Sequence, residues 1–208
     1  MMREWRSFKE LFAELNKECN YLVLRNYQDI SDDGKAVSGH EDIDFLCDDI
    51  DKLEAVCGGT PRKKKNDRIH QKIKVNGVEI PVDIRTVGDG YYDPAWEVEM
   101  LKNRRKYKEL LYIMDEKNEL YSLIYHVIIQ KNSISADYAK KLADMAGIPE
   151  FTEAYGIKEL EDYMRERGYK YTYPEYPGGI FHREKGAADL REVNPARAVR
   201  RFLHRYIR

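Results

Sequence analysis

The spacing of hydrophobic residues in the first half of the chain alternates between a helical and a strand-like period. Hydrophobic residues in the segment 4–18 recur every three or four positions, which predicts an amphipathic helix. The short apolar run Tyr21–Leu24 follows and predicts a strand. A second apolar strand is predicted around 42–46.

The clearest local pattern lies in residues 68–85, where two alternating segments flank Asn76-Gly77. Asn-Gly is a preferred two-residue turn of a β-hairpin, and the turn fixes the pairing of the two strands. The predicted register places Val75 opposite Val78 and, further along, His70 opposite Asp83. Val75 and Val78 belong to the core face of the hairpin, and Asp83 to the opposite face.

The remaining segments add helices and one strand. Asp48 or Asp49 is expected to cap a short helix over 51–56 that ends at Gly58-Gly59. Further predicted elements are a helix over 93–103, a strand over 109–114, helices over 115–131, 135–145, 158–167 and 195–207, and an irregular segment over 169–195. The predicted fold class is α+β, a mixed β-sheet flanked by helices in residues 1–114 followed by a helical C-terminal region in 115–208.

Composition narrows the functional classes. Charged residues make up 35% of the 208 residues and the net charge is −1, which argues against a general nucleic-acid binder. The three cysteines have no C-x-x-C spacing, and Cys47 and Cys57 lie in apolar surroundings typical of core thiols. No window is long and apolar enough for a transmembrane segment, and the N-terminus lacks an apolar signal-like region, so we expect a cytoplasmic protein.

Two carboxylates stand one residue apart in the stretch Gly39–Leu46. In a strand Asp42 and Asp44 share one face, where like charges repel and an unpaired buried carboxylate is costly. A divalent cation such as Mg²⁺, which takes oxygen ligands, relieves both problems. The alternative is a strand end whose two acids point into water.

Asp83 adds a third acid. It stands between Val82 and Ile84, which are predicted to face the core, so its side chain points to the other face of the sheet. If the strands of Asp42 and Asp83 are neighbours, three carboxylates converge on one open face. The alternative for Asp83 is an ion pair with a cationic side chain, for which the sequence offers Lys72, Arg85 and His70.

An Asp-x-Asp strand followed by a β-hairpin that brings a third Asp resembles the DNA polymerase β-like nucleotidyltransferase superfamily, over roughly residues 4–115. The resemblance implies a nucleotidyltransferase-like fold with an appended helical region. It also implies that Asp42, Asp44 and Asp83 hold two Mg²⁺ or Mn²⁺ ions, which bind a nucleotide donor and activate an acceptor hydroxyl. All three acids are thus expected to be catalytic and metal-binding.

A narrower resemblance rests on Leu24-Arg25-Asn26-Tyr27 followed by Gly39-His40-Glu41-Asp42-Ile43-Asp44. It points to uncharacterised nucleotidyltransferase-like proteins associated with bacterial surface-polysaccharide genes, and distantly to phosphocholine-type transferases that decorate such glycans. It implies a small-molecule or glycan acceptor and a role in polysaccharide biosynthesis.

The phosphate-binding part departs from the superfamily, which has a Gly-Gly or Gly-Ser pair at a helix start before the acids. Here that corner carries Arg25-Asn26, and Ser38-Gly39 directly precedes the acids. Arg25 is expected either to replace the backbone amides as a phosphate ligand or to form an ion pair with Asp42 or Asp44. The remaining candidates for binding the nucleotide cofactor are Ser38, Gly39, His40 and Arg85, and His70 is a further candidate for phosphate contact. For His40, His70 and Arg85 the alternative is a polar residue without that role.

The function expected from these features is metal-dependent transfer of a nucleotidyl or phosphoryl group from a nucleotide to a hydroxyl, with Asp83 helping to take the proton. Two alternatives remain open: a phospho-alcohol transferase that uses a CDP-linked donor, and a degenerate fold that only binds a nucleotide or a partner.

Two further groups of residues each allow two interpretations. Lys63–Lys65 form a solvated turn or an anion site, and the aromatic cluster of Tyr91, Tyr92 and Trp96 lines the cleft or belongs to the core.

Overall fold

The computed structural model describes residues 2–30, 42–62, 67–131 and 134–172. Within these residues the chain forms six α-helices and eight β-strands, arranged as a mixed sheet flanked by helices. The chain divides into two compact units. The first unit contains Met1–Asp89 and Glu97–Asp115, and the second contains Gly90–Trp96 and the chain from Glu116 onward.

All eight strands lie in the first unit and form one sheet of order β1-β5-β6-β3-β2-β8-β7, with β4 also paired to β5. Their bounds are β1 Glu4–Trp5, β2 Tyr21–Val23, β3 Ile43–Cys47, β4 Thr60–Pro61, β5 His70–Val75, β6 Val78–Thr86, β7 Arg105–Tyr107 and β8 Leu111–Ile113. The pairs β1–β5, β3–β6 and β2–β8 are parallel, and the other pairs are antiparallel.

The β5–β6 hairpin has the predicted register. Val75 pairs with Val78 across the Asn76-Gly77 turn, and His70 pairs with Asp83 at the far end. Both turn residues have positive φ, 50° for Asn76 and 80° for Gly77, as a tight hairpin of this kind requires. The turn chemistry therefore fixes the register of β6. The predicted core position of Val78 was wrong, because this residue stands beside the turn and is 52% exposed.

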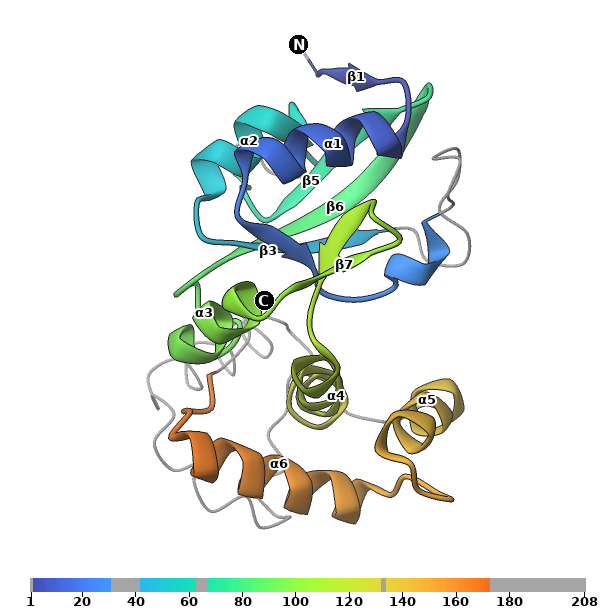
Figure 1. The fold of residues 1–208 in the computed structure, drawn as a ribbon, viewed down its shortest axis with the longest axis vertical. Helices are drawn as coiled ribbons and strands as arrows, with labels where there is room; N and C mark the ends of the chain where they lie inside the picture. The colour runs from blue at the N-terminus through green and yellow to red at the C-terminus, as the bar shows by residue number, and fades with distance from the viewer. Residues whose placement is uncertain (1, 31–41, 63–66, 132–133, 173–208) are drawn as a thin grey trace, which may run out of the picture. The chain divides into compact units, whose positions relative to one another are not determined.

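Two helices pack on one face of this sheet, α1 (Phe8–Glu18) and α2 (Ile50–Cys57), and they lie side by side in Figure 1. Leu11 and Phe12 of α1 belong to the same buried cluster as Phe45 of β3 and Val82 and Ile84 of β6. Because strand residues alternate between faces, this packing directs Asp44 and Asp83 to the face opposite α1 and α2.

The cap of α2 was predicted from the sequence. The Asp49 carboxylate accepts a hydrogen bond from the backbone N–H of Lys52 at 3.0 Å, and Gly58 ends the helix in a left-handed conformation. Cys47 and Cys57 are buried, as expected for core thiols, and Cys19 is buried as well.

The predicted helix over 4–18 was wrong at its start. Ser7 caps α1, its hydroxyl accepting from the Glu10 N–H, and the helix begins only at Phe8. Trp5 instead lies in β1, paired with Val75, and its indole N–H donates to the Cys57 carbonyl at 3.0 Å. Its spacing from Phe8 matched a helix only because both side chains enter the same core.

The last hairpin of the sheet was only half predicted. The strand expected over 109–114 corresponds to β8, but β7 precedes it and pairs with it. Lys108 and Glu109 in the connecting loop have positive φ values of 50° and 53°. Neither is the Gly or Asn that usually marks such a turn, so the sequence carried no turn signal here.

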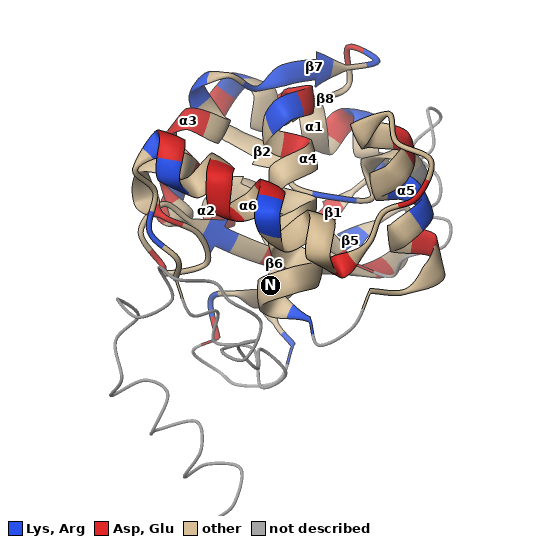
Figure 2. Ribbon diagram, turned by 90° about the horizontal axis from the view of Figure 1, so that it is seen from below, with Lys and Arg blue, Asp and Glu red and all other residues tan. Residues whose placement is uncertain are grey.

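The second unit is helical where it is described. It contains α4 (Glu116–Tyr125), which continues into a π-helical turn at His126–Gln130, then α5 (Ala136–Ala146) and α6 (Glu153–Arg167). Figure 2 shows charged residues of both signs on α6. Asp162 of this helix pairs with Lys158 and Arg165. No helix among the described residues has both the length and the apolarity needed to cross a membrane.

Tyr91, Tyr92 and Trp96 are buried, and the Tyr92 and Trp96 rings contact that of Tyr125 edge to face. They belong to the core, the second of the two roles considered for them. Trp96 lies in the first turn of the helix α3 (Pro94–Lys102), which agrees with the prediction over 93–103. The predicted helix over 195–207, and the irregular segment beyond residue 172, lie outside the described residues.

Gly58 provides a test of the packing between α2 and the N-terminal segment. Its φ is +62°, and a Cβ at this position would collide with the Cβ of Arg3. We expect Gly58→Ala to lower the free energy of unfolding by about 2 kcal/mol or more, since strained backbone and a clash combine. The measurement is urea denaturation followed by circular dichroism.

The matched control is Gly77→Ala, where φ is +80° but no atom lies within 4 Å of the added Cβ. It carries the backbone cost alone, about 1 kcal/mol. Equal losses in the two variants would show that Arg3 does not pack closely on Gly58.

Candidate metal centre

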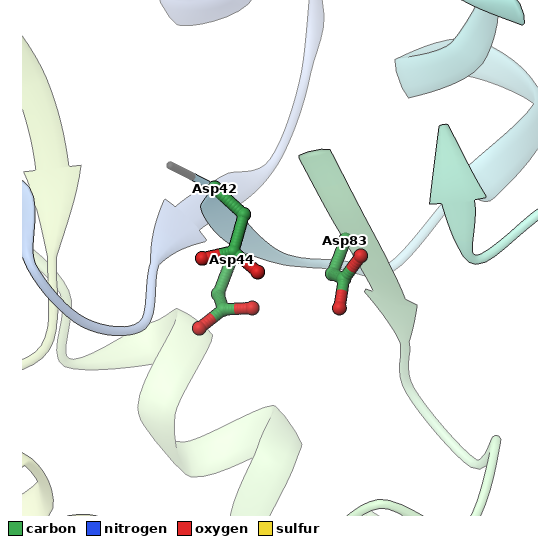
Figure 3. Close-up of side chains that lie close together, drawn as sticks. All are labelled: Asp42, Asp44 and Asp83. Atoms are coloured by element: carbon green, nitrogen blue, oxygen red, sulfur yellow. The ribbon is translucent and has the colours of Figure 1, made fainter. Parts of the chain in front are cut away.

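The parallel pairing of β3 with β6 brings the predicted acids together. Asp44 and Asp83 are direct partners across these strands, so their side chains leave the sheet on the same face. Asp42 stands two residues before Asp44 and therefore shares that face. One carboxylate oxygen from each of the three lies within 4.8 Å of the other two. Figure 3 shows the three carboxylates turned toward the same space.

The acids are less exposed than expected for an open sheet face. The Asp83 side chain is 4% exposed and that of Asp44 is 16% exposed. Burial raises the pKa of the Asp83 carboxyl, and the negative charge of Asp44 raises it further, while Arg62 acts in the opposite direction. Ionised Asp83 is thus costly here and gains from positive charge nearby.

Arg25 brings a positive charge to Asp44. The backbone N–H of Leu24 donates to the Asp44 carbonyl at 2.8 Å, which continues the β2–β3 ladder to the residue before Arg25. The Arg25 Nη2 then donates to Asp44 Oδ2 at 2.7 Å. Asn26 follows in a left-handed conformation with φ 58°. Of the two roles considered for Arg25, the structure shows the ion pair with Asp44.

Arg62 supplies the second charge, and sequence reasoning missed it. Its backbone N–H donates to the backbone carbonyl of His70 at 2.9 Å, which places Arg62 beside His70, directly after the end of β4. Since His70 pairs with Asp83, and Asp83 with Asp44, these four polar residues form one row across four strands. The Arg62 Nη2 donates to Asp83 Oδ1 at 2.5 Å.

The partners expected for Asp83 have other contacts. Lys72 pairs with Glu79 at 2.7 Å. Arg85 is buried, and its Nη1 lies 3.7 Å from Asp89 Oδ2.

His70 stands in the row, but its Nδ1 lies 3.0 Å from Asp67 Oδ2, which orients the ring. His70 and Arg85 are therefore held within the first unit by carboxylates outside the acid cluster. Ser38, Gly39, His40 and Lys63–Lys65 lie outside the described residues, so their predicted roles stay predictions.

The donor set fits a hard divalent cation. Three carboxylates from two adjacent strands offer the oxygen ligands that Mg²⁺ and Mn²⁺ prefer. Ligands at about 2.1 Å from one Mg²⁺ lie at most about 4.2 Å apart, so the acids need only a small inward adjustment. In the described part of the chain, Arg25 pairs with Asp44 and Arg62 with Asp83, and Asp42 adds a third negative charge that a cation could neutralise.

No family model matches the chain, and no curated protein matches it. The superfamily relationship predicted from the motifs remains a prediction, and the chemistry of the centre follows from its geometry.

The buried Asp83 predicts a pH dependence of stability when a chelator is present. The pKa of Asp83 is higher in the folded than in the unfolded protein, so the folded protein binds the proton more tightly. The resulting contribution to stability is fully present below the unfolded pKa and is lost as the pH rises through the folded pKa. We expect Asp83→Asn to be more stable than the wild type at pH 7, with the gain disappearing below the unfolded pKa of about 3.9. Urea denaturation in EDTA across this pH range measures it.

The control is Asp51→Asn, whose carboxylate is exposed and pairs with Arg68. Its effect should stay within about 0.5 kcal/mol at each pH. An Asp83→Asn variant that is less stable than the wild type at pH 7 would show that the Arg62 ion pair outweighs the burial of the carboxylate.

Proposed function

We propose that this protein is a metal-dependent transferase with a nucleotidyltransferase-like fold, which moves a nucleotidyl or phosphoryl group from a nucleotide to the hydroxyl of a small molecule or glycan. The observation that carries the proposal is the convergence of Asp42, Asp44 and Asp83 on one face of the sheet. The mixed sheet with helices on the opposite face agrees with it.

In this proposal Asp42, Asp44 and Asp83 hold the cations. Bound divalent ions would neutralise phosphate charge and lower the pKa of an acceptor hydroxyl. Asp83 is the group best placed to accept the hydroxyl proton, because burial and Asp44 already favour its protonated form. Arg25 and Arg62 add positive charge beside the acids, which suits an anionic phosphate donor.

A second candidate function is binding of a nucleotide or partner without turnover. The observation in its favour is that Arg25 and Arg62 already neutralise Asp44 and Asp83. In a protein that never binds a cation, the two acids would serve only as ion-pair partners of these arginines. The two candidates differ in whether ligand binding requires a metal.

Thermal unfolding with ligands separates these candidates. We expect Mg²⁺ together with a nucleoside triphosphate to stabilise the wild type by about 2.7 kcal/mol at 100 times the dissociation constant. Asp42→Asn and Asp83→Asn should stay folded, bind Mn²⁺ at least about 10-fold more weakly and lose metal-dependent transfer, since even outer-shell changes at metal sites cost 10–100-fold.

A CDP-alcohol in place of the triphosphate tests the phospho-alcohol donor in the same assay. Asp51→Asn, which removes an exposed carboxylate outside the cluster, serves as the charge control. Stabilisation by nucleotide with equal strength in EDTA would contradict the transferase and support binding without turnover. Full transfer activity in Asp42→Asn or Asp83→Asn would remove that residue from the reaction.

A further inference from the structure

Arg62 is paired with a carboxylate that is also a candidate ligand for a cation. It ends the row Arg62, His70, Asp83 and Asp44, and its guanidinium donates to Asp83 Oδ1 at 2.5 Å. The same Asp83 carboxylate is one of the three that lie within ligand distance of a shared cation. Arg62 therefore competes with a cation for Asp83.

The ion-paired position leaves Arg62 incompletely satisfied. A guanidinium has five N–H donors, and the Arg62 Nε is buried without a hydrogen-bond partner among the described residues. A buried donor without an acceptor is unfavourable, so a second position that gives the guanidinium more acceptors gains stability. The side chain is 26% exposed, which leaves it room to move, whereas the Asp83 side chain is 4% exposed.

A phosphate is the ligand that matches the released group. Guanidinium binds phosphate oxygens through two parallel N–H donors, and its positive charge survives in any environment. Arg25 is a less suitable candidate, because its side chain is only 10% exposed in its pair with Asp44.

We propose that Arg62 exchanges partners. It is the counter-ion of Asp83 until a divalent cation binds that carboxylate, and it then binds a phosphate group of the incoming nucleotide. This inference rests on the proposed function and adds to it a residue that couples cation binding to recognition of the phosphate. Because coupling is reciprocal, the phosphate ligand also strengthens binding of the cation.

The exchange predicts opposite effects of one substitution on two ligands. Arg62→Gln removes the competitor for Asp83, so Mn²⁺ alone should bind about 2–5-fold more tightly. This gain in affinity corresponds to the free energy of a partly exposed ion pair. It also removes the phosphate contact, so the preformed complex of Mn²⁺ with inorganic tripolyphosphate should bind at least about 10-fold more weakly. Isothermal titration calorimetry on the full chain measures both.

Arg68→Gln is the matched control, because Arg68 also bridges carboxylates, those of Asp51 and Glu54, but lies outside the row. Both affinities should be unchanged in it. If Arg62→Gln does not fold, Arg62→Lys takes its place. It keeps the charge without the two parallel donors and should also bind the tripolyphosphate complex more weakly.

The outcomes separate the two proposals. A wild type that binds neither Mn²⁺ nor its tripolyphosphate complex refutes the proposed function, and the exchange with it. A wild type that binds both, while Arg62→Gln changes both affinities in the same direction or leaves either unchanged, refutes the exchange alone. Arg62→Lys keeps a competitor for Asp83, so for this variant an unchanged affinity for the tripolyphosphate complex refutes the exchange. Opposite changes in Arg62→Gln, with none in Arg68→Gln, support it.

Discussion

The parallel pairing of β3 with β6 is the interaction on which the candidate centre depends. It sets Asp44 directly opposite Asp83, and the neighbouring residues Phe45, Val82 and Ile84 enter the core on the other face. A shift of one residue in this pairing would move apolar side chains out of the core and acids into it, at a large cost. The packing of the core therefore also fixes the position of the acids.

The same geometry creates an electrostatic problem that the chain partly solves by itself. Two adjacent carboxylates on one buried face repel each other, and the raised pKa of Asp83 reflects this repulsion together with burial. Arg25 and Arg62 reach the cluster from β2 and β4, at opposite sides of the β3–β6 pair. These ion pairs lower the cost of holding the acids close together.

The cluster combines carboxylate oxygens, which are hard ligands, with the adjacent guanidinium groups of Arg25 and Arg62. This combination suits a ligand that carries both a divalent cation and phosphate groups, and is less suited to a cation alone. It is the physical reason for favouring phosphoryl or nucleotidyl transfer over a structural ion site.

The sequence predicts local features of this fold better than long-range ones. The Asn76-Gly77 turn determines the hairpin register and with it the face of Asp83, because the relevant contacts are close in sequence. The adjacency of β3 and β6 was only a condition of the prediction, since α2, β4 and β5 lie between them in the chain and no local signal specifies a parallel partner.

Arg62 shows why part of the site could not be predicted. Arg62 directly follows β4, which has only two residues and includes Pro61, so no alternation marks this strand as part of the sheet. Its approach to Asp83 passes through two strand pairings, β4 with β5 and β5 with β6. Trp5, by contrast, gave a misleading signal. Its spacing predicted a helix, but it lies in β1, from which its side chain enters the core.

Anomalous X-ray diffraction from crystals soaked with Mn²⁺ shows whether Asp42, Asp44 and Asp83 share a cation. We expect a manganese peak at about 2.0–2.3 Å from an oxygen of each of the three carboxylates, with Arg62 no longer paired with Asp83. Crystals without a manganese peak at these acids, in which the guanidinium groups of Arg25 and Arg62 keep their ion pairs, would contradict it.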